Sequence, residues 1–150
     1  MNKMNELLVG AASNDITPKS SQFLYGYPHE ERYSTGVHDP LESSAIYFGD
    51  NSEEFIIIGN DIIYISRQQT DLIRTKIYEK TGIPKEKILV SGTHTHSGPV
   101  MTEHLSHEMD SVVPPPDPEY CNFFIEQVAD TGIEAYKKRK PASIGLTVAS

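Results

Sequence analysis

The residues best suited to chemistry lie in the run Ser91–Pro99, which reads SGTHTHSGP and carries His94 and His96. Two histidines at positions i and i+2 of an extended backbone point to the same side, about 7 Å apart at Cα. Neutral imidazole is a ligand that suits zinc, so the pair can supply two metal ligands, or one ligand and one group acting beside it. The neighbouring serine and threonine hydroxyls can hold the rings in one tautomer.

The spacing of the two histidines is compatible with a second interpretation. A pair of histidines at the edge of a strand, each satisfied by hydrogen bonds, has the same pattern. The surrounding sequence favours a site, because the run follows an apolar segment, residues 87–91, and precedes a long loop. In open α/β sheets ligands bind beyond the carboxyl ends of the strands. Gly92 and Gly98 would let the backbone approach such a ligand closely.

The apolar runs that must position this segment predict an α/β fold, a mixed sheet with a parallel βαβ unit and flanking helices. The expected strands are residues 7–12, 45–48, 54–58, 87–91 and 143–148, and the expected helices are residues 66–80 and 117–138. Strand, helix and strand between residues 54 and 91 form a right-handed parallel crossover. Residues 55–58 are apolar on both faces, which predicts a strand inside the sheet.

Ser66 is expected to cap the first helix and Gly82 to end it, while Asp117 and Pro118 begin the second. Residues 19–40, rich in glycine, proline and aromatic residues, are expected to form a loop, and residues 25–40 of it are expected to wall a cleft into which both histidines point.

Several polar residues outside the histidine run are weaker candidates. His38 could face a metal pocket or bond to backbone. Asp61 follows a buried strand and could accept a hydrogen bond from a ligand histidine, or cap a turn. His104 and His107, three residues apart, could bind metal on a helical turn or be exposed to solvent. Cys121 is expected to be a structural thiol in an amphipathic helix.

The composition excludes some classes of partner. The formal net charge is −8, from 21 acidic and 13 basic residues, which argues against nucleic acid and anionic membrane surfaces. The single cysteine allows no intrachain disulfide. No segment resembles a signal peptide or a membrane span, so we expect a soluble, cytoplasmic protein, or a secreted one if further sequence precedes Met1. The oligomeric state stays open.

The run from Ser91 to Pro99 resembles the signature of the neutral, non-lysosomal ceramidases. The similarity extends upstream through residues 10–18, residues 26–27, residues 36–41 and residues 60–61. It therefore spans nearly the whole chain. The sequence departs from the family's common pattern at residues 42–45, which read ESSA, where an arginine commonly precedes the alanine.

The resemblance implies a zinc-dependent amidase that cleaves the N-acyl bond of ceramide. It implies that His94 is a zinc ligand and that His96 lies beside the substrate as a catalytic residue. Gly26, His38 and Asp61 are candidates to contact the substrate or the metal ligands. The family's other ligands, a histidine, a glutamate and a tyrosine, come later in its catalytic domain. We therefore expect residues 1–150 to be the N-terminal part of a larger α/β catalytic domain, with an incomplete site.

Three functions follow as hypotheses. The first is hydrolysis of a lipid amide such as ceramide with zinc as the cofactor. The second is hydrolysis of another linear N-acyl amide by the same chemistry. The third is a catalytically inactive binding or interaction domain, because a catalytic zinc site needs about three protein ligands.

Overall fold

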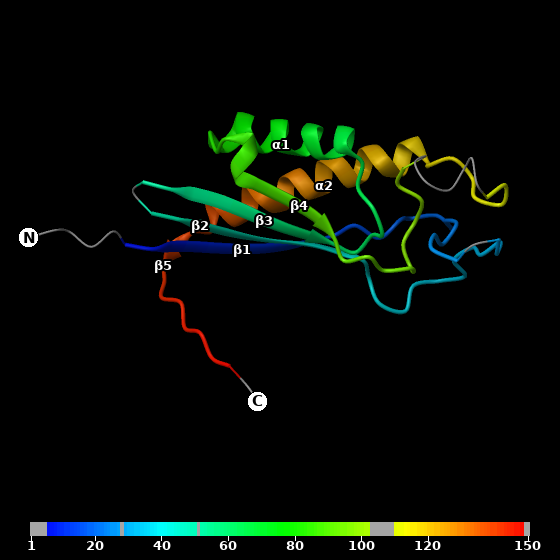
Figure 1. The fold of residues 1–150 in the computed structure, drawn as a ribbon, viewed down its shortest axis with the longest axis horizontal. Helices are drawn as coiled ribbons and strands as arrows, with labels where there is room; N and C mark the ends of the chain where they lie inside the picture. Colours follow the sequence, from blue (N-terminus) through cyan, green and yellow to red (C-terminus); the bar gives the residue numbers. More distant parts are fainter. Residues whose placement is uncertain (1–5, 28, 51, 103–109, 149–150) are drawn as a thin grey trace, which may run out of the picture.

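The chain forms a five-stranded sheet with the strand order β4-β3-β2-β1-β5 (Figure 1). The computed structural model describes residues 6–27, 29–50, 52–102 and 110–148. The strands are β1 Leu8–Asp15, β2 Glu42–Gly49, β3 Glu54–Asn60, β4 Ile88–Gly92 and β5 Lys140–Pro141. Strands β3 and β4 are parallel and the other neighbours are antiparallel. The predicted mixed sheet with one parallel βαβ unit is confirmed.

Both helices, α1 Arg67–Thr81 and α2 Pro118–Lys137, lie on one face of the sheet (Figure 1). A short 3-10 helix, η1 Lys85–Lys87, leads into β4. Neither α-helix is long and apolar enough to cross a membrane, a finding that holds for the described part of the chain.

The helix ends follow the predicted capping residues. Ser66 forms a capping box at the start of α1, because its side chain accepts from the Gln69 N–H and the Gln69 side chain accepts from the Ser66 N–H. Gly82 ends α1 in the left-handed conformation, with φ of 79°. Asp117 caps α2, with proline at the first helical position.

The hydrophobic core lies between the helices and one face of the sheet. Its central side chains are fully buried and come from β3, α1 and α2. They include Ile56, Ile58, Ile73, Ile77, Phe124 and Val128. Burial of each such side chain stabilises the fold by about 1.5–3 kcal/mol. This packing orients β3 and β4 and therefore positions the loops that follow them.

The other face of the sheet carries no helix in the described structure. Strand β3 lies inside the sheet as predicted, but only one of its two apolar faces is covered. Ile56 and Ile58 are fully buried, whereas Phe55 and Ile57 are 42% and 41% exposed. Apolar residues on both faces of β3 therefore do not mean that helices cover both faces of the described sheet.

The predicted strand at residues 143–148 is wrong. Strand pairing with β1 involves only Lys140 and Pro141, opposite Val9 and Leu8. The described residues beyond β5, 142–148, have no strand pairing, apart from one hydrogen bond from the Ala142 N–H to the Leu7 carbonyl. The alternating apolar pattern is present, but a strand also needs a neighbouring strand to pair with.

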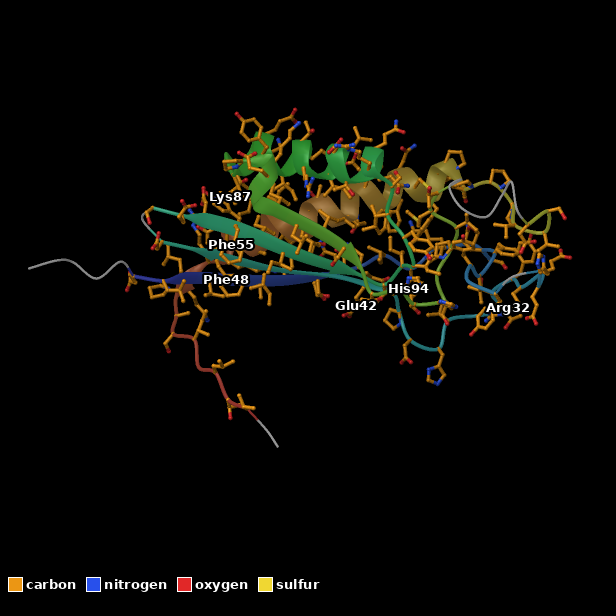
Figure 2. All side chains as sticks on the ribbon, in the orientation of Figure 1. Arg32, Glu42, Phe48, Phe55, Lys87 and His94 are labelled. Carbon is orange, nitrogen blue, oxygen red and sulfur yellow. The ribbon has the colours of Figure 1, made fainter. Side chains whose placement is uncertain are left out.

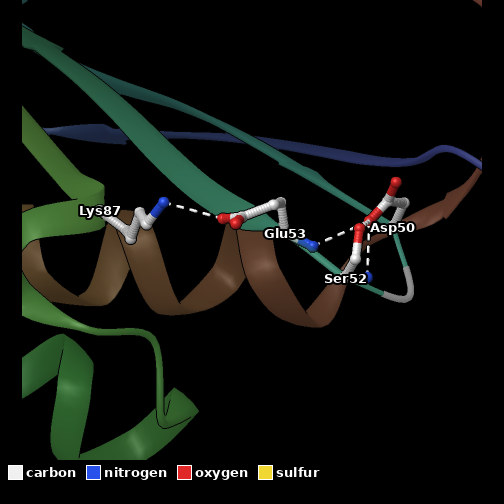
Figure 3. A network of polar contacts seen from close by, with 4 residues as sticks. All are labelled: Asp50, Ser52, Glu53 and Lys87. Atoms are coloured by element: carbon white, nitrogen blue, oxygen red, sulfur yellow. Dashed lines mark hydrogen bonds and ion pairs between the residues drawn. The ribbon is translucent and has the colours of Figure 1, made fainter.

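The hairpin between β2 and β3 lies at the opposite end of the sheet from the histidine run. One carboxylate oxygen of Asp50 accepts hydrogen bonds from the Ser52 N–H, the Ser52 hydroxyl and the Glu53 N–H (Figure 3). The Lys87 ammonium lies 2.8 Å from a Glu53 carboxylate oxygen (Figure 3). These contacts join the beginnings of β3 and β4.

Candidate functional site

The histidine run leaves the carboxyl end of β4 and is held against the segment that follows β3. Asn60 and Gly92 are paired at the ends of the two parallel strands. Beyond them, the Thr93 N–H donates to the Asn60 carbonyl at 2.8 Å, and the His94 N–H donates to the Ile62 carbonyl at 3.1 Å. A Cβ at Gly92 would lie 2.7 Å from the Ile62 carbonyl oxygen, so this close approach requires glycine.

The two imidazoles lie close together, but the backbone there is not the extended strand that the sequence predicted. Their ring centroids are 5.3 Å apart and the ring planes are inclined by 67°. Strand β4 ends at Gly92, and His94 has a φ of +66°, in the left-handed region. That conformation is uncommon for a residue with a Cβ and often occurs at functional sites. The left-handed backbone at His94, and not the alternation of an extended strand, sets the geometry.

The loop before β2 packs against His96. Gly26 has a φ of +123°, and a Cβ there would lie 2.5 Å from Cγ of the His96 ring. Tyr27 meets the same ring edge to face, with centroids 5.4 Å apart. The Arg32 guanidinium in turn lies 3.9 Å from the centroid of the Tyr27 ring. Gly26 thus lies directly against the His96 ring, and its expected contact with substrate or metal ligands stays a prediction.

Tyr64 packs against the other histidine, His94. The two ring centroids are 5.1 Å apart with an interplanar angle of 73°. Tyr25 contacts Tyr64 in turn, at 6.1 Å. His94 lies near Glu42, at the carboxyl-end edge of the sheet, while Phe48 and Phe55 lie towards the hairpin (Figure 2). Each of the two histidines therefore packs against one tyrosine, His96 against Tyr27 and His94 against Tyr64.

The donor set of this pair fits part of a zinc site. Neither imidazole forms a hydrogen bond to another described residue, so the ring nitrogens are not engaged by protein groups in that part of the chain. His94 is exposed and His96 is half-buried. No group of three or more His, Cys, Asp or Glu residues within the described ranges could hold a metal ion. The pair can supply one or two ligands, and a catalytic zinc needs about three.

Asp61 acts at the sheet edge next to the histidine run. Its carboxylate accepts from the Thr93 hydroxyl at 3.1 Å and from the Glu42 N–H at 3.0 Å. By making both contacts, Asp61 links Glu42 at the start of β2 to Thr93, the residue before His94. These bonds link segments that are distant in the sequence, so they are neither a local turn cap nor a contact with a ligand histidine.

His38 lies away from the paired imidazoles. Its side chain is 97% exposed, and its Nδ1 is 2.7 Å from a carboxylate oxygen of Asp39. Both residues line an open cavity of about 1090 Å³ formed mainly by residues 17–41. The cavity also touches Asp61, Thr95 and Ser97, but neither His94 nor His96 is among its lining residues. Gly26 and Tyr27 pack against His96, whereas this cavity is lined by other residues of the loop and is not the predicted cleft around the two histidines.

The remaining candidates do not join the pair in the described structure. His104 and His107 lie outside the described residues. Cys121 is partly buried at the start of α2, where its thiol is 3.6 Å from Nε2 of Gln69. Burial raises the pKa of the Cys121 thiol, which favours an unreactive structural group.

Tyr64 and Tyr27 were not identified as site residues from the sequence. Tyr27 directly follows Gly26, so its neighbour already pointed to it. Tyr64 comes three residues after Asp61, in the segment that leaves the same buried strand. Its position beyond the carboxyl end of that strand is the sequence feature that points to it. Its contact with His94 depends on how two loops pack together.

The chain resembles neutral ceramidases in sequence. Residues 7–117 match the family model described as neutral/alkaline non-lysosomal ceramidase, N-terminal. "Neutral ceramidase 3" of Arabidopsis thaliana is 30% identical over 99 residues, which are 63% of this chain and 14% of the relative. "Neutral ceramidase" of Oryza sativa subsp. japonica is 29% identical over 96 residues, 61% of this chain and 12% of the relative. The chain thus matches about one seventh of the length of these relatives.

The fold is also similar to that of solved ceramidases. The neutral ceramidase of Pseudomonas aeruginosa superposes with a TM-score of 0.79 at 19% identity, covering 93% of this chain and 23% of that protein. A ceramidase structure described as complexed with C2 gives a TM-score of 0.77, covering 92% and 22%. The paired histidines at the end of β4 therefore lie in a ceramidase-like fold, and the matched family model shows that this chain belongs to the neutral/alkaline non-lysosomal ceramidase family.

Proposed function

We propose that this chain forms part of a zinc-dependent amide hydrolase that cleaves ceramide or a similar N-acyl lipid amide. The observation that carries the proposal is the pair of converging imidazoles, 5.3 Å apart, whose nitrogens bond to no other described residue. The family membership and the relatives named neutral ceramidase support the reaction class and the substrate class.

The two histidines have different roles in this proposal. His94 would bind zinc together with ligands from outside the described residues. When bound, zinc polarises a carbonyl and lowers the pKa of bound water to about 7. The His96 imidazole hydrogen-bonds the attacking water or the developing oxyanion. Gly26 and Tyr27 limit the positions open to that ring, which keeps its nitrogen directed at the reacting group.

The number of ligands leads to a prediction for residues 1–150 taken alone. With one or two imidazoles, this polypeptide should bind zinc weakly and hydrolyse no amide at a measurable rate. Titration with zinc chloride and an assay with a fluorescent N-acyl amide would measure both. Stoichiometric tight zinc binding with robust amidase activity would contradict the incomplete site.

The decisive test uses the product of the full reading frame. His94→Ala should remove zinc and activity together, because a ligand of a site with three or four protein ligands cannot be lost without a large fall in affinity. His96→Ala should retain most of the zinc and lower kcat by about 10²–10³. Zinc content by elemental analysis and kcat are measured for each variant.

Each outcome of that test has a definite meaning. Equal loss of zinc in both variants would make both imidazoles ligands and overturn the division of roles. Full zinc content in His94→Ala would overturn the metal site at this position. Intact zinc without hydrolysis of any N-acyl amide by the unmodified protein would favour the alternative of an inactive binding domain, which the two-residue donor set keeps open.

A further inference from the structure

The loop before β2 holds a cation that no described group neutralises. Arg32 lies in the loops beyond the carboxyl end of the sheet, on the same side as His94 (Figure 2). Its Nη1 is buried and forms no hydrogen bond with a described residue. No carboxylate in the described ranges lies within 4.0 Å of this side chain. Because buried polar groups are nearly always hydrogen-bonded and an unpaired buried charge is costly, this guanidinium lacks an anionic partner.

A second arginine shows that stacking on a tyrosine does not account for the missing partner. Arg139 and Arg32 stack alike, at 3.8 Å from the centroid of Tyr136 and 3.9 Å from that of Tyr27. Nη1 of Arg139, however, donates to the Tyr136 carbonyl at 2.7 Å. The chain has 21 acidic residues and 13 basic ones, so carboxylates are not scarce. The unpaired donor is therefore a feature of the Arg32 position.

The backbone fixes Arg32 relative to the histidine run. The Leu24 N–H donates to the Arg32 carbonyl at 2.8 Å, and Leu24 itself forms an antiparallel bridge with Pro99. The Tyr25 N–H donates to the Gly98 carbonyl at 3.1 Å. Arg32 is thus joined through one paired segment to the residues that follow the histidines.

The Arg32 side chain lies between that run and a cavity. The Tyr27 ring on which it stacks also packs against His96, with centroids 5.4 Å apart. Arg32 lines the cavity of about 1090 Å³ together with Thr95 and Ser97, the neighbours of His96 on either side. Stacking holds the guanidinium plane in place before a ligand arrives. A molecule in this cavity could reach Arg32 while its other end approaches the imidazole.

We propose that Arg32 binds the carboxylate of a substrate that carries this group next to its scissile amide, as an N-acyl amino acid does. A guanidinium presents parallel N–H groups that match the two oxygens of a carboxylate. A neutral substrate such as ceramide leaves the buried donor unpaired and is therefore disfavoured. The inference rests on the proposed amide hydrolysis and names its substrate class. Water adds to the acyl carbon, the carbon–nitrogen bond breaks and the nitrogen takes a proton, which releases a fatty acid and an amino acid.

The first test measures binding to the product of the full reading frame with ligands that cannot be hydrolysed. In 4-oxododecanoate a methylene replaces the amide nitrogen of N-nonanoylglycine, and in 1-hydroxydodecan-4-one a hydroxymethyl group also replaces the carboxylate. Calorimetry should show about 10–100-fold tighter binding of the carboxylate. Arg32→Gln should remove this difference and leave binding of the neutral ketone unchanged. Arg67→Gln removes the same charge from the exposed start of α1 and should keep the difference.

Three binding results would overturn the proposal. The first is equal affinity of the unmodified protein for the two ketones. The second is an equal effect of Arg67→Gln and Arg32→Gln, which would show a general effect of charge. The third uses dodecanoate, whose carboxylate is that of a fatty acid product. If Arg32→Gln weakens dodecanoate and not 4-oxododecanoate, Arg32 binds the product and not the substrate.

The second test measures hydrolysis of N-nonanoylglycine and of the neutral N-nonanoylethanolamine. The ratio of their kcat/KM values should fall about 10–100-fold in Arg32→Gln. Arg32→Lys should restore part of it, because lysine keeps the charge without the fork. Equal loss of both activities would show that Arg32 only supports the loop and would overturn the proposal. If the unmodified protein hydrolyses neither amide, the proposed function fails, and the calorimetry still decides whether Arg32 binds a carboxylate.

Discussion

The two ends of the sheet differ in how their polar groups are satisfied. At the hairpin end, Asp50 accepts three hydrogen bonds and Lys87 pairs with Glu53. At the other end, the imidazoles of His94 and His96 face each other without a hydrogen bond to any other described residue, and His94 has a positive φ. At the hairpin end, hydrogen bonds close the turn and an ion pair joins two strands. Strained backbone beside ring nitrogens without described partners is typical of a binding site.

The comparison also shows how the fold separates stability from chemistry. The buried isoleucines of β3 and the helices fix the sheet, and both ends extend from it. Only the carboxyl end of the parallel pair receives loops from three parts of the chain, which follow β1, β3 and β4. Substitutions at this end should therefore change the geometry of the imidazoles, and substitutions at the hairpin end should not.

Among substitutions that leave both imidazoles in place, the largest effect is expected from Gly26→Ala. The new Cβ would clash with the His96 ring in a backbone conformation that L-residues rarely adopt. We expect about 1–3 kcal/mol lower unfolding free energy and roughly 10–100-fold lower activity of the full protein. Urea unfolding and the imidazole NMR signals of His96 measure the two effects. Gly36→Ala is the control, because a Cβ there has no neighbour within 4 Å, and an equal response to both substitutions would contradict the proposed contact.

Asp61→Ala tests the role of the carboxylate beside the histidine run. It removes the acceptor for the Glu42 N–H and the Thr93 hydroxyl, so the unfolding free energy should fall by about 1–3 kcal/mol. Because Asp61 bonds to Glu42 and Thr93 and to neither imidazole, its loss should have little effect on the zinc affinity of the full protein. A 10–100-fold loss of zinc affinity with unchanged stability would instead show that Asp61 acts through a ligand histidine.

Tyr64→Leu should loosen His94 without unfolding the protein. An aromatic pair contributes about 0.5–1.5 kcal/mol beyond its buried area, so zinc affinity of the full protein should fall about 2–10-fold. Tyr64→Phe keeps the ring contact at 5.1 Å and should behave like the unmodified protein. If phenylalanine fails to restore the affinity, the Tyr64 hydroxyl and not its ring is the important group.

The ionisation of Tyr47, near the hairpin end, should affect the unfolding free energy only at high pH. Burial, with a hydrogen bond to Glu54, raises the pKa of Tyr47 from 10.0 to about 12. The folded state thus favours the neutral phenol, so this contribution is complete below pH 10 and is lost as the pH rises through 12. Urea unfolding between pH 9 and pH 11.5 should show a shallower decline for Tyr47→Phe.

The smallest effect is expected from Lys87→Met. This substitution removes the ion pair with Glu53, and both side chains of that pair are partly exposed to solvent. Exposed ion pairs add little to stability and are screened by salt. We expect a slight change in melting temperature that disappears at high ionic strength, and unchanged zinc affinity. A loss of zinc would show that the two ends of the sheet are coupled, contrary to the comparison above.

The sequence alone determined the local structure of this protein. Ser66, Gly82 and Asp117 mark helix ends because capping depends on neighbours within a few residues. The parallel unit followed from strand, helix and strand in series, and His94 with His96 could be named because the SGTHTHSGP run lies next to a buried strand. Each of these inferences uses contacts or patterns that are local in the chain.

Only the tertiary structure decided what depends on distant segments. Among the described residues, 143–148 alternate like a strand but pair with no neighbour, and β3 is apolar on a face that no described helix covers. The positive φ of His94 and the contact of Tyr64 with its ring arise from packing between loops separated in sequence. Periodicity shows that a side chain is apolar and on which face it lies, but the packing of distant segments decides what covers it.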